Sequence, residues 1–240
     1  MKLMTIALLF LFPFTSTSLK EKTHSENYIF KEKYRTADSW SREELKKANT
    51  AGNANYLSLE EKDMLIYLNL ARIDGAKFFD TYFQDFVDER NQVMRQYSNY
   101  NDLKIDRNSS YYRSLRRDLQ NIKNLPVFWP DEVLSQVATL HAKDLNRNNY
   151  IGHNSSDGRS SGERISRVYP RKANGECLAF GYNSGLDNIC MLLLDKGVPD
   201  LGHRKLMLNT SAQLNTVGLS FHPHQRYKYC AVIDFVSLPN

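Results

Sequence analysis

The sequence predicts an α+β domain in which helices come first and a small antiparallel sheet closes the chain. Helical patterns fill most of residues 41–145, where apolar side chains recur at intervals of three and four. One short strand is expected at residues 175–181, another helix follows it, and alternating residues at 217–221 and 227–235 predict a final β-hairpin. With 240 residues, 41% of them hydrophobic, the chain is long enough for one elaborated core.

The first 18 residues are typical of a secretory signal peptide. A basic start precedes an apolar run over residues 3–14, and small polar residues follow it. That run is too short to cross a bilayer and no later run is long enough, so we expect no transmembrane anchor. We expect a secreted or periplasmic protein with a polar leader at 19–40 and a folded domain at 41–240, including a helical insertion near 88–125.

Two capping boxes mark the first helices. Ser41 with Glu44, and Ser58 with Glu61, have the Ser-x-x-Glu spacing in which side chains satisfy free amides at a helix start. Apolar residues then share a helical face at Met64, Tyr67, Leu68 and Ala71, and after Gly75 at Phe79, Tyr82, Phe83 and Phe86. An aromatic stripe at this spacing favours core packing over the alternative of a ligand pocket.

Residues 88–125 carry eight Lys and Arg against five Asp and Glu, within a chain of formal charge +5. Behind the possible caps Ser109 and Ser110, one helical face holds Tyr112, Leu115, Leu119 and Ile122. The arginines around the remaining faces favour a solvated surface, with a partner surface as the alternative. This small local excess of positive charge comes with no recognisable nucleic-acid-binding motif, so we expect no nucleic-acid partner.

The next helix is expected to begin with Pro130 at its first position, where acids that follow suit the helix dipole. His141 shares its apolar stripe, which favours a hydrogen-bonded core histidine over a metal ligand. His153 follows in a loop rich in Asn, Ser, Gly and Asp. His222 and His224 are expected to be exposed in the hairpin turn, with a metal pair as the alternative.

Three cysteines occur, at Cys177, Cys190 and Cys230. One interpretation is that they are buried small hydrophobic residues. The other is that an oxidising compartment allows one disulfide, with Cys230 on the final strand as a partner, and leaves one thiol. Cys190 lies on the apolar face of a helix that Asp187 is expected to cap, so it is expected to be unreactive as a thiol or to form half of a bridge.

Four short segments recur in one order: Gly152-His153, Gly175-Glu176-Cys177, Gly202-His203 and Asp234-Phe235. This set resembles the CAP superfamily of cysteine-rich secretory proteins, antigen 5 and pathogenesis-related 1 proteins, also called the SCP domain, in its bacterial secreted form. The resemblance spans residues 41–235 and implies a three-layer α-β-α sandwich with a broad cleft. Two departures occur, because Cys177 replaces the usual Asn and the second glutamate is missing, with Asp195 nearest to its place.

The resemblance implies that the cleft holds a divalent cation, zinc above others, at His153, His203, Glu176 and Asp195. Neutral imidazoles bind zinc well, and a carboxylate either binds the ion or orients a histidine that does. No His-Glu-x-x-His helix places a general base beside such a metal. No other cofactor is expected.

Two functions follow from this cleft, and whether the protein is an enzyme stays open. The favoured one is a secreted binding module for a divalent cation and an extracellular ligand, which in the family is a lipid, sterol, glycan or protein. The alternative is a metal-assisted hydrolase of peptide or cell-wall polymer. A Ser-His hydrolase using Ser155 or Ser156 with His153 lacks a nucleophile elbow. A shared fold alone does not decide between these functions. The replacement of the second glutamate favours the binding module.

Overall fold

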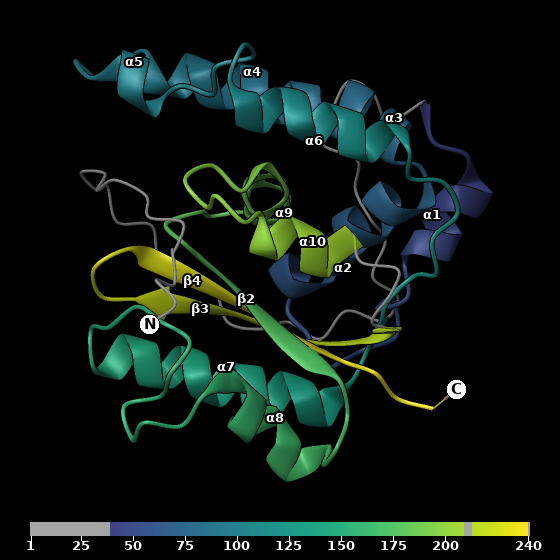
Figure 1. Ribbon diagram of the computed structural model, residues 1–240, viewed down its shortest axis with the longest axis vertical. Helices are drawn as coiled ribbons and strands as arrows, with labels where there is room; N and C mark the ends of the chain where they lie inside the picture. The colour runs from purple at the N-terminus through teal and green to yellow at the C-terminus, as the bar shows by residue number, and fades with distance from the viewer. Residues whose placement is uncertain (1–38, 209–212, 240) are drawn as a thin grey trace.

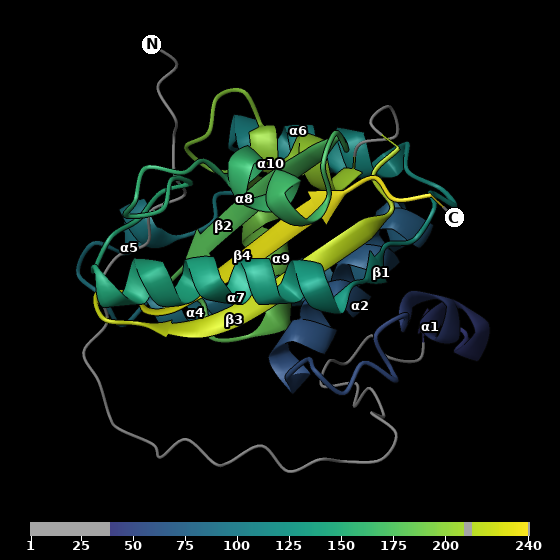
Figure 2. The same cartoon turned by 90° about the horizontal axis from the view of Figure 1, so that it is seen from below.

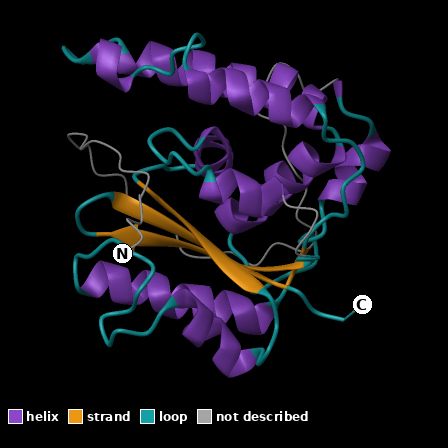
Figure 3. Ribbon diagram, viewed as in Figure 1, coloured by secondary structure: helices purple, strands orange, loops and turns teal. Residues whose placement is uncertain are grey.

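The computed structural model describes residues 39–208 and 213–239. The signal peptide expected at 1–18 and all but the last two residues of the expected leader lie outside these ranges. The described chain has a mixed β-sheet between two sets of helices, which confirms the α+β class and the α-β-α sandwich (Figure 1 and Figure 3). Among the described residues, no helix is both long and apolar enough to span a bilayer.

The sheet has the strand order β1-β3-β4-β2 within the described residues. Its strands are β1 (Trp129–Pro130), β2 (Asn174–Phe180), β3 (Thr216–His224) and β4 (Lys228–Val236). β1 runs parallel to β3, and the other pairs are antiparallel, with the expected hairpin β3–β4 at the centre. The small sheet is thus antiparallel except for a short parallel strand at one edge.

Helices α7 (Glu132–Arg147) and α8 (Ser161–Val168) cover one face of the sheet. Figure 2 shows α7 lying across β3 and β4, with α8 nearer to β2. The contact is apolar, because Ala138, Ala142 and Leu145 of α7 pack with Leu178 and Val232 of the sheet. Small residues on α7 allow this close approach.

The other face is covered by α2 (Leu59–Ile73), α9 (Gly185–Leu194) and α10 (Gly202–Leu208), with α1 (Arg42–Ala48) beside α2. A further layer lies outside them in Figure 1: α3 (Gly75–Phe78), the π-helical turn η2 (Phe79–Phe83), α4 (Gln84–Met94), α5 (Tyr100–Leu103) and α6 (Ser110–Gln120). The aromatic stripe of this layer is buried at Phe79, Tyr82, Phe83 and Phe86, which confirms its assignment to the core.

Helix starts were predicted partly correctly. Both capping boxes form, with Ser41 and Ser58 accepting the amides three residues on. The start at Pro130 is wrong: Pro130 is held extended by pairing with β3, and Asp131 caps α7 by accepting the Leu134 amide at 2.7 Å. The Asp187 cap is also wrong, because Ser184 caps α9 and accepts the Asp187 amide.

Two expectations about the C-terminal hairpin and the cysteines are wrong. His224 is only 2% exposed, with its Nε2 3.0 Å from the Tyr150 carbonyl, because β3 continues further than expected and carries it under the Phe180 ring. His222 is partly exposed. All three cysteines are free and buried, which agrees with their interpretation as small hydrophobic residues, whereas the alternative of one disulfide among these described residues is wrong.

Candidate functional site

The first histidine–carboxylate pair joins the loop after α7 to β2. His153 Nδ1 lies 2.7 Å from Glu176 Oε1. The glutamate side chain is fully buried, whereas the His153 side chain keeps 19% of its surface exposed. A buried carboxylate therefore holds an imidazole whose other edge faces outward.

The loop that carries His153 is fastened to α7 at two points. His141, a buried core residue as expected, has its Nε2 3.0 Å from the Gly152 carbonyl. Asp144 accepts both the amide and the hydroxyl of Ser156, at 2.7 and 2.6 Å. Gly152 has φ 149°, and a Cβ there would overlap the Tyr150 hydroxyl, so this position requires glycine.

Arg164, which sequence reasoning assigned no function, is the charge partner of Glu176. Its guanidinium donates to Glu176 Oε2 and, at 2.8 Å, to the His153 carbonyl. Burial alone would raise the pKa of Glu176, but the hydrogen bond from His153 and the Arg164 charge lower it below its usual value. Glu176 is thus ionised and neutralised within the protein.

The second pair lies between α9 and α10. His203, in the first turn of α10, has its Nδ1 2.7 Å from Asp195 Oδ1. Asp195 ends α9 in the left-handed conformation, with φ 55°, and its other oxygen accepts the Arg204 amide at 3.1 Å. Both side chains are buried. The structure thus brings Asp195, the residue nearest to the missing glutamate, against the second histidine.

Cys177 lies between the two pairs. It follows Glu176 along β2, and its Sγ is 4.0 Å from the His203 carbonyl. Burial, and then the Asp195 charge, raise the pKa of this thiol well above its ordinary value. The thiol is therefore neutral and belongs to the packing between β2 and α10, which is a structural role for the position where the family usually has Asn.

Asp234 adds a second carboxyl beside Glu176. It lies opposite Glu176 in the β2–β4 register and is completely buried. Burial first, and the Glu176 charge second, raise its pKa well above the usual value. Asp234 is therefore neutral. The sequence placed it only as part of a motif, because nothing in its neighbourhood signals a buried acid.

The residues predicted to bind a metal thus form two pairs, His153 with Glu176 and His203 with Asp195. Within the described ranges, no three His, Cys, Asp or Glu side chains gather in a group that could hold a metal ion. The four-residue metal site stays a prediction.

The pairs nevertheless suit a metal in one respect. Each Nδ1 is engaged by a carboxylate, and no hydrogen bond from the described residues occupies either Nε2. A histidine that binds zinc usually donates its other N–H to a carboxylate in this manner.

Comparison with known proteins identifies the family. The model of the family described as "CAP: Cysteine-rich secretory protein family" matches residues 89–235, more than half of the chain. The protein therefore belongs to the CAP family. No curated protein matches it.

Two solved structures are similar to parts of the chain. One is an extracellular protein containing an SCP domain from Bacillus anthracis str. Ames, with 28% identity and a TM-score of 0.40 over 48% of this chain and 35% of that one. The other is an outer surface protein from Borrelia burgdorferi, with 22% identity and a TM-score of 0.41 over 56% of this chain and 97% of that one. The chain thus spans about a third of the length of the Bacillus protein.

Proposed function

We propose that the protein is a secreted binding module in which His153 and His203 bind one divalent cation, zinc above others, through their Nε2 atoms. The observation that carries this proposal is the pair of Nδ1–carboxylate hydrogen bonds, each 2.7 Å long. A carboxylate that accepts from Nδ1–H fixes the tautomer whose Nε2 carries the lone pair. Both histidines are thus prepared as ligands.

In this proposal Glu176 and Asp195 orient the histidines instead of binding the ion. Glu176 is neutralised by Arg164, whereas the described contacts of Asp195 are with His203 and a backbone amide. The buried charge of Asp195 therefore favours a cation nearby. A bound zinc ion would supply a Lewis acid with coordination positions open to an extracellular ligand, for which the family suggests a lipid, sterol, glycan or protein.

The serine hydroxyls near His153 support binding over a Ser-His hydrolase. Ser155 Oγ accepts from Arg164 at 3.2 Å, and Ser156 Oγ donates to Asp144 at 2.6 Å. Neither hydroxyl is paired with an imidazole, as an activated nucleophile would be.

Calorimetric titration with zinc tests the proposal. We expect His153→Ala and His203→Ala each to remove most zinc binding, whereas Glu176→Gln and Asp195→Asn should lower the affinity by about 10–100-fold through the orienting hydrogen bonds. His222→Ala is the matched control, since His222 is partly exposed and outside both pairs, and it should bind as wild type. If both His153→Ala and His203→Ala bind zinc with the affinity of wild type, the proposal is wrong.

A second measurement separates binding from catalysis. Zinc-loaded protein is incubated with unfolded casein and with purified peptidoglycan, and release of soluble fragments is followed. The binding-module proposal expects no release. Release that disappears in His153→Ala would establish the metal-assisted hydrolase instead.

A further inference from the structure

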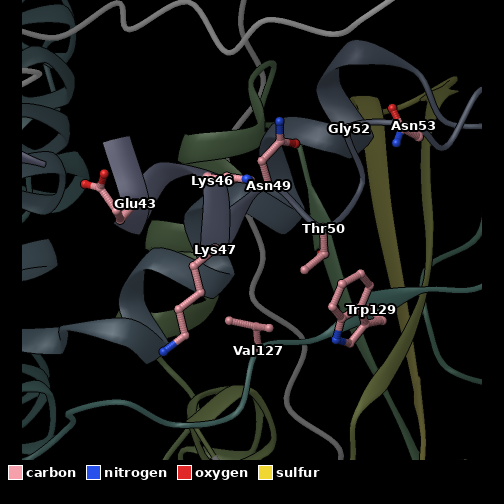
Figure 4. Close-up of a pocket in the computed structure, with 9 residues that line it drawn as sticks. All are labelled: Glu43, Lys46, Lys47, Asn49, Thr50, Gly52, Asn53, Val127 and Trp129. Atoms are coloured by element: carbon pink, nitrogen blue, oxygen red, sulfur yellow. The ribbon is translucent and has the colours of Figure 1, made fainter. Parts of the chain in front are cut away.

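A pocket of about 610 Å³ opens at the sheet edge formed by β1, whereas Glu176 of the first pair lies on β2 at the opposite edge. It is lined by the end of α1, by the turn at residues 49–53 and by Val127 and Trp129. Its volume is within the range of small-ligand sites. Figure 4 shows Thr50, Val127 and Trp129 gathered on one side and Lys47 extending along another.

The wall of this pocket is held rigidly from beneath. Asn69 of α2 is fully buried, and its amide donates to the carbonyls of Ala48 and Phe128 at 3.0 and 3.1 Å. Its oxygen accepts the Phe128 amide at 2.8 Å, and Thr50 Oγ1 donates to the Phe128 carbonyl at 2.7 Å. The turn and the strand are therefore fixed relative to each other before any ligand arrives, which reduces the entropy lost on binding.

Trp129 is a largely exposed aromatic residue. Its side chain is 58% exposed, and no ring contact or side-chain hydrogen bond to the described residues involves its indole. The other tryptophan, Trp40, is 5% exposed, lies against Tyr82 and donates to Thr81 at 3.3 Å. A large exposed aromatic on a rigid wall is informative, because it gains free energy when a flat apolar surface covers it.

The polar side chains that line this pocket together with Trp129 are exposed to a ligand. Lys46, Lys47 and Asn53 are exposed and have no ion pair or hydrogen bond from their side chains within the described residues. In Figure 4 the carboxylate of Glu43, the acid in this lining, points away from Trp129. The pocket lining thus supplies two lysines and an asparagine in addition to the indole, with Glu43 as its acid.

We propose that this pocket binds a short oligosaccharide that carries carboxylate groups, such as a uronic acid oligomer. The C–H face of a pyranose covers the indole of Trp129, the ammonium groups of Lys46 and Lys47 bind carboxylate, and the amide of Asn53 meets hydroxyls.

Tryptophan fluorescence tests this site directly, because the chain contains only two tryptophans. In a Trp40→Phe background the signal comes from Trp129 alone. We expect a galacturonic acid trimer to shift the emission to the blue and to protect it from acrylamide quenching. A neutral galactose trimer should bind at least about fivefold more weakly, since it lacks the carboxylates.

Calorimetry on the full chain compares the uronate affinity of wild type with that of single and double variants. Trp129→Ala should lower affinity for the uronate trimer at least about tenfold, and the double variant Lys46→Gln/Lys47→Gln about as much. Lys143→Gln, an exposed lysine on α7 outside this pocket, is the matched control and should bind as wild type. Zinc affinity should not change in any of these variants.

Four results would overturn the proposal or its requirement for carboxylate. The first is uronate binding that survives Trp129→Ala, and the second is neither trimer altering Trp129 emission. The third is protection of Trp129 that rises with protein concentration without saccharide, which would make this face an interface between copies of the chain. Equal affinity for both trimers would reject the requirement for carboxylate.

Discussion

The two histidine–carboxylate pairs use the same hydrogen bond at the same distance but are stabilised differently. Glu176 is held by a buried arginine, Arg164, whose charge it neutralises. At the second pair the guanidinium of the buried Arg204 does not bind the carboxylate. It donates instead to the Leu193 and Leu194 carbonyls at 2.7 and 2.8 Å. Asp195 thus receives an amide but no guanidinium. The comparison shows that similar geometry can come from charge balance at one site and from backbone conformation at another.

The largest expected effect tests the charge balance of the first pair. Arg164→Met leaves the Glu176 carboxylate buried without its cation, which should cost about 3–5 kcal/mol of unfolding free energy. Urea unfolding measures this loss. Glu176→Gln in the same chain should restore part of it, since the uncompensated charge is then gone.

The matched control for this variant is Arg159→Ala, whose ion pair with Asp157 is exposed at the surface. It should change the unfolding free energy very little. If Arg164→Met is as mild as this control, Glu176 does not depend on arginine and the contrast between the pairs fails.

The second prediction concerns the backbone at Asp195. Asp195→Ala loses the hydrogen bonds to His203 and Arg204 and strains the left-handed residue, and should cost about 2–3 kcal/mol. Asp195→Asn should cost less, because Asn tolerates this conformation and keeps one acceptor. Thermal unfolding ranks the variants, and equal losses for Asn and Ala would argue against the backbone explanation.

Zinc affinity provides a third test of the difference between the two pairs. Asp195→Asn removes a carboxylate that no guanidinium neutralises, whereas Glu176→Gln removes one that Arg164 already neutralises. We therefore expect the Asp195 variant to lose more zinc affinity, by about three- to tenfold beyond the Glu176 variant. The reverse order in calorimetry would contradict the charge argument.

A smaller effect is expected at Cys177, which lies between the pairs. Burial raises the pKa of Cys177 and Cys190 well above the usual thiol value and that of Cys230 to about 12. Native protein should therefore resist a maleimide reagent, and unfolded protein should label at three thiols. Labelling of one thiol after unfolding without reductant would show that a disulfide forms.

Cys177→Ala should lower the free energy of unfolding by about 1 kcal/mol.

The smallest expected effect is pH-dependent and concerns the loop of the first pair. Burial acts to raise the pKa of Asp144, but the hydrogen bonds from the Ser156 hydroxyl and amide together lower it below its ordinary value. A lowered folded-state pKa gives stability above the ordinary value that is lost as pH falls through the lowered one. The stability difference between wild type and Asp144→Ala should therefore be constant near neutral pH and shrink below about pH 4. A constant difference in acid would contradict this.

Sequence patterns predicted the parts of this fold that depend on local chemistry. The capping boxes at Ser41 and Ser58 and the alternating hairpin were correct because each is a short-range signal. Pro130 and His224 were misplaced because the outcome depends on β3, which pairs with one and extends to include the other. The pairing of Pro130 with Val217 joins positions that are far apart in the chain, and it leaves no local trace in the sequence.

The candidate site was predicted only where a motif names the residue. The ordered glycine–histidine segments identified His153 and His203, and position alone suggested Asp195. Arg164 was missed because an arginine after a capping glutamate is also typical of a solvated helix. Asp234 was named only as part of a motif and given no role, because its burial opposite Glu176 arises only when β2 pairs with β4.

The strand order has a consequence for how the protein is made. The two central strands, β3 and β4, come from residues 216–236, so β2 has its sheet partner only after that hairpin has been synthesised. Such long-range pairing slows folding. The sheet of a nascent chain of this design therefore cannot form until its last two strands have been synthesised.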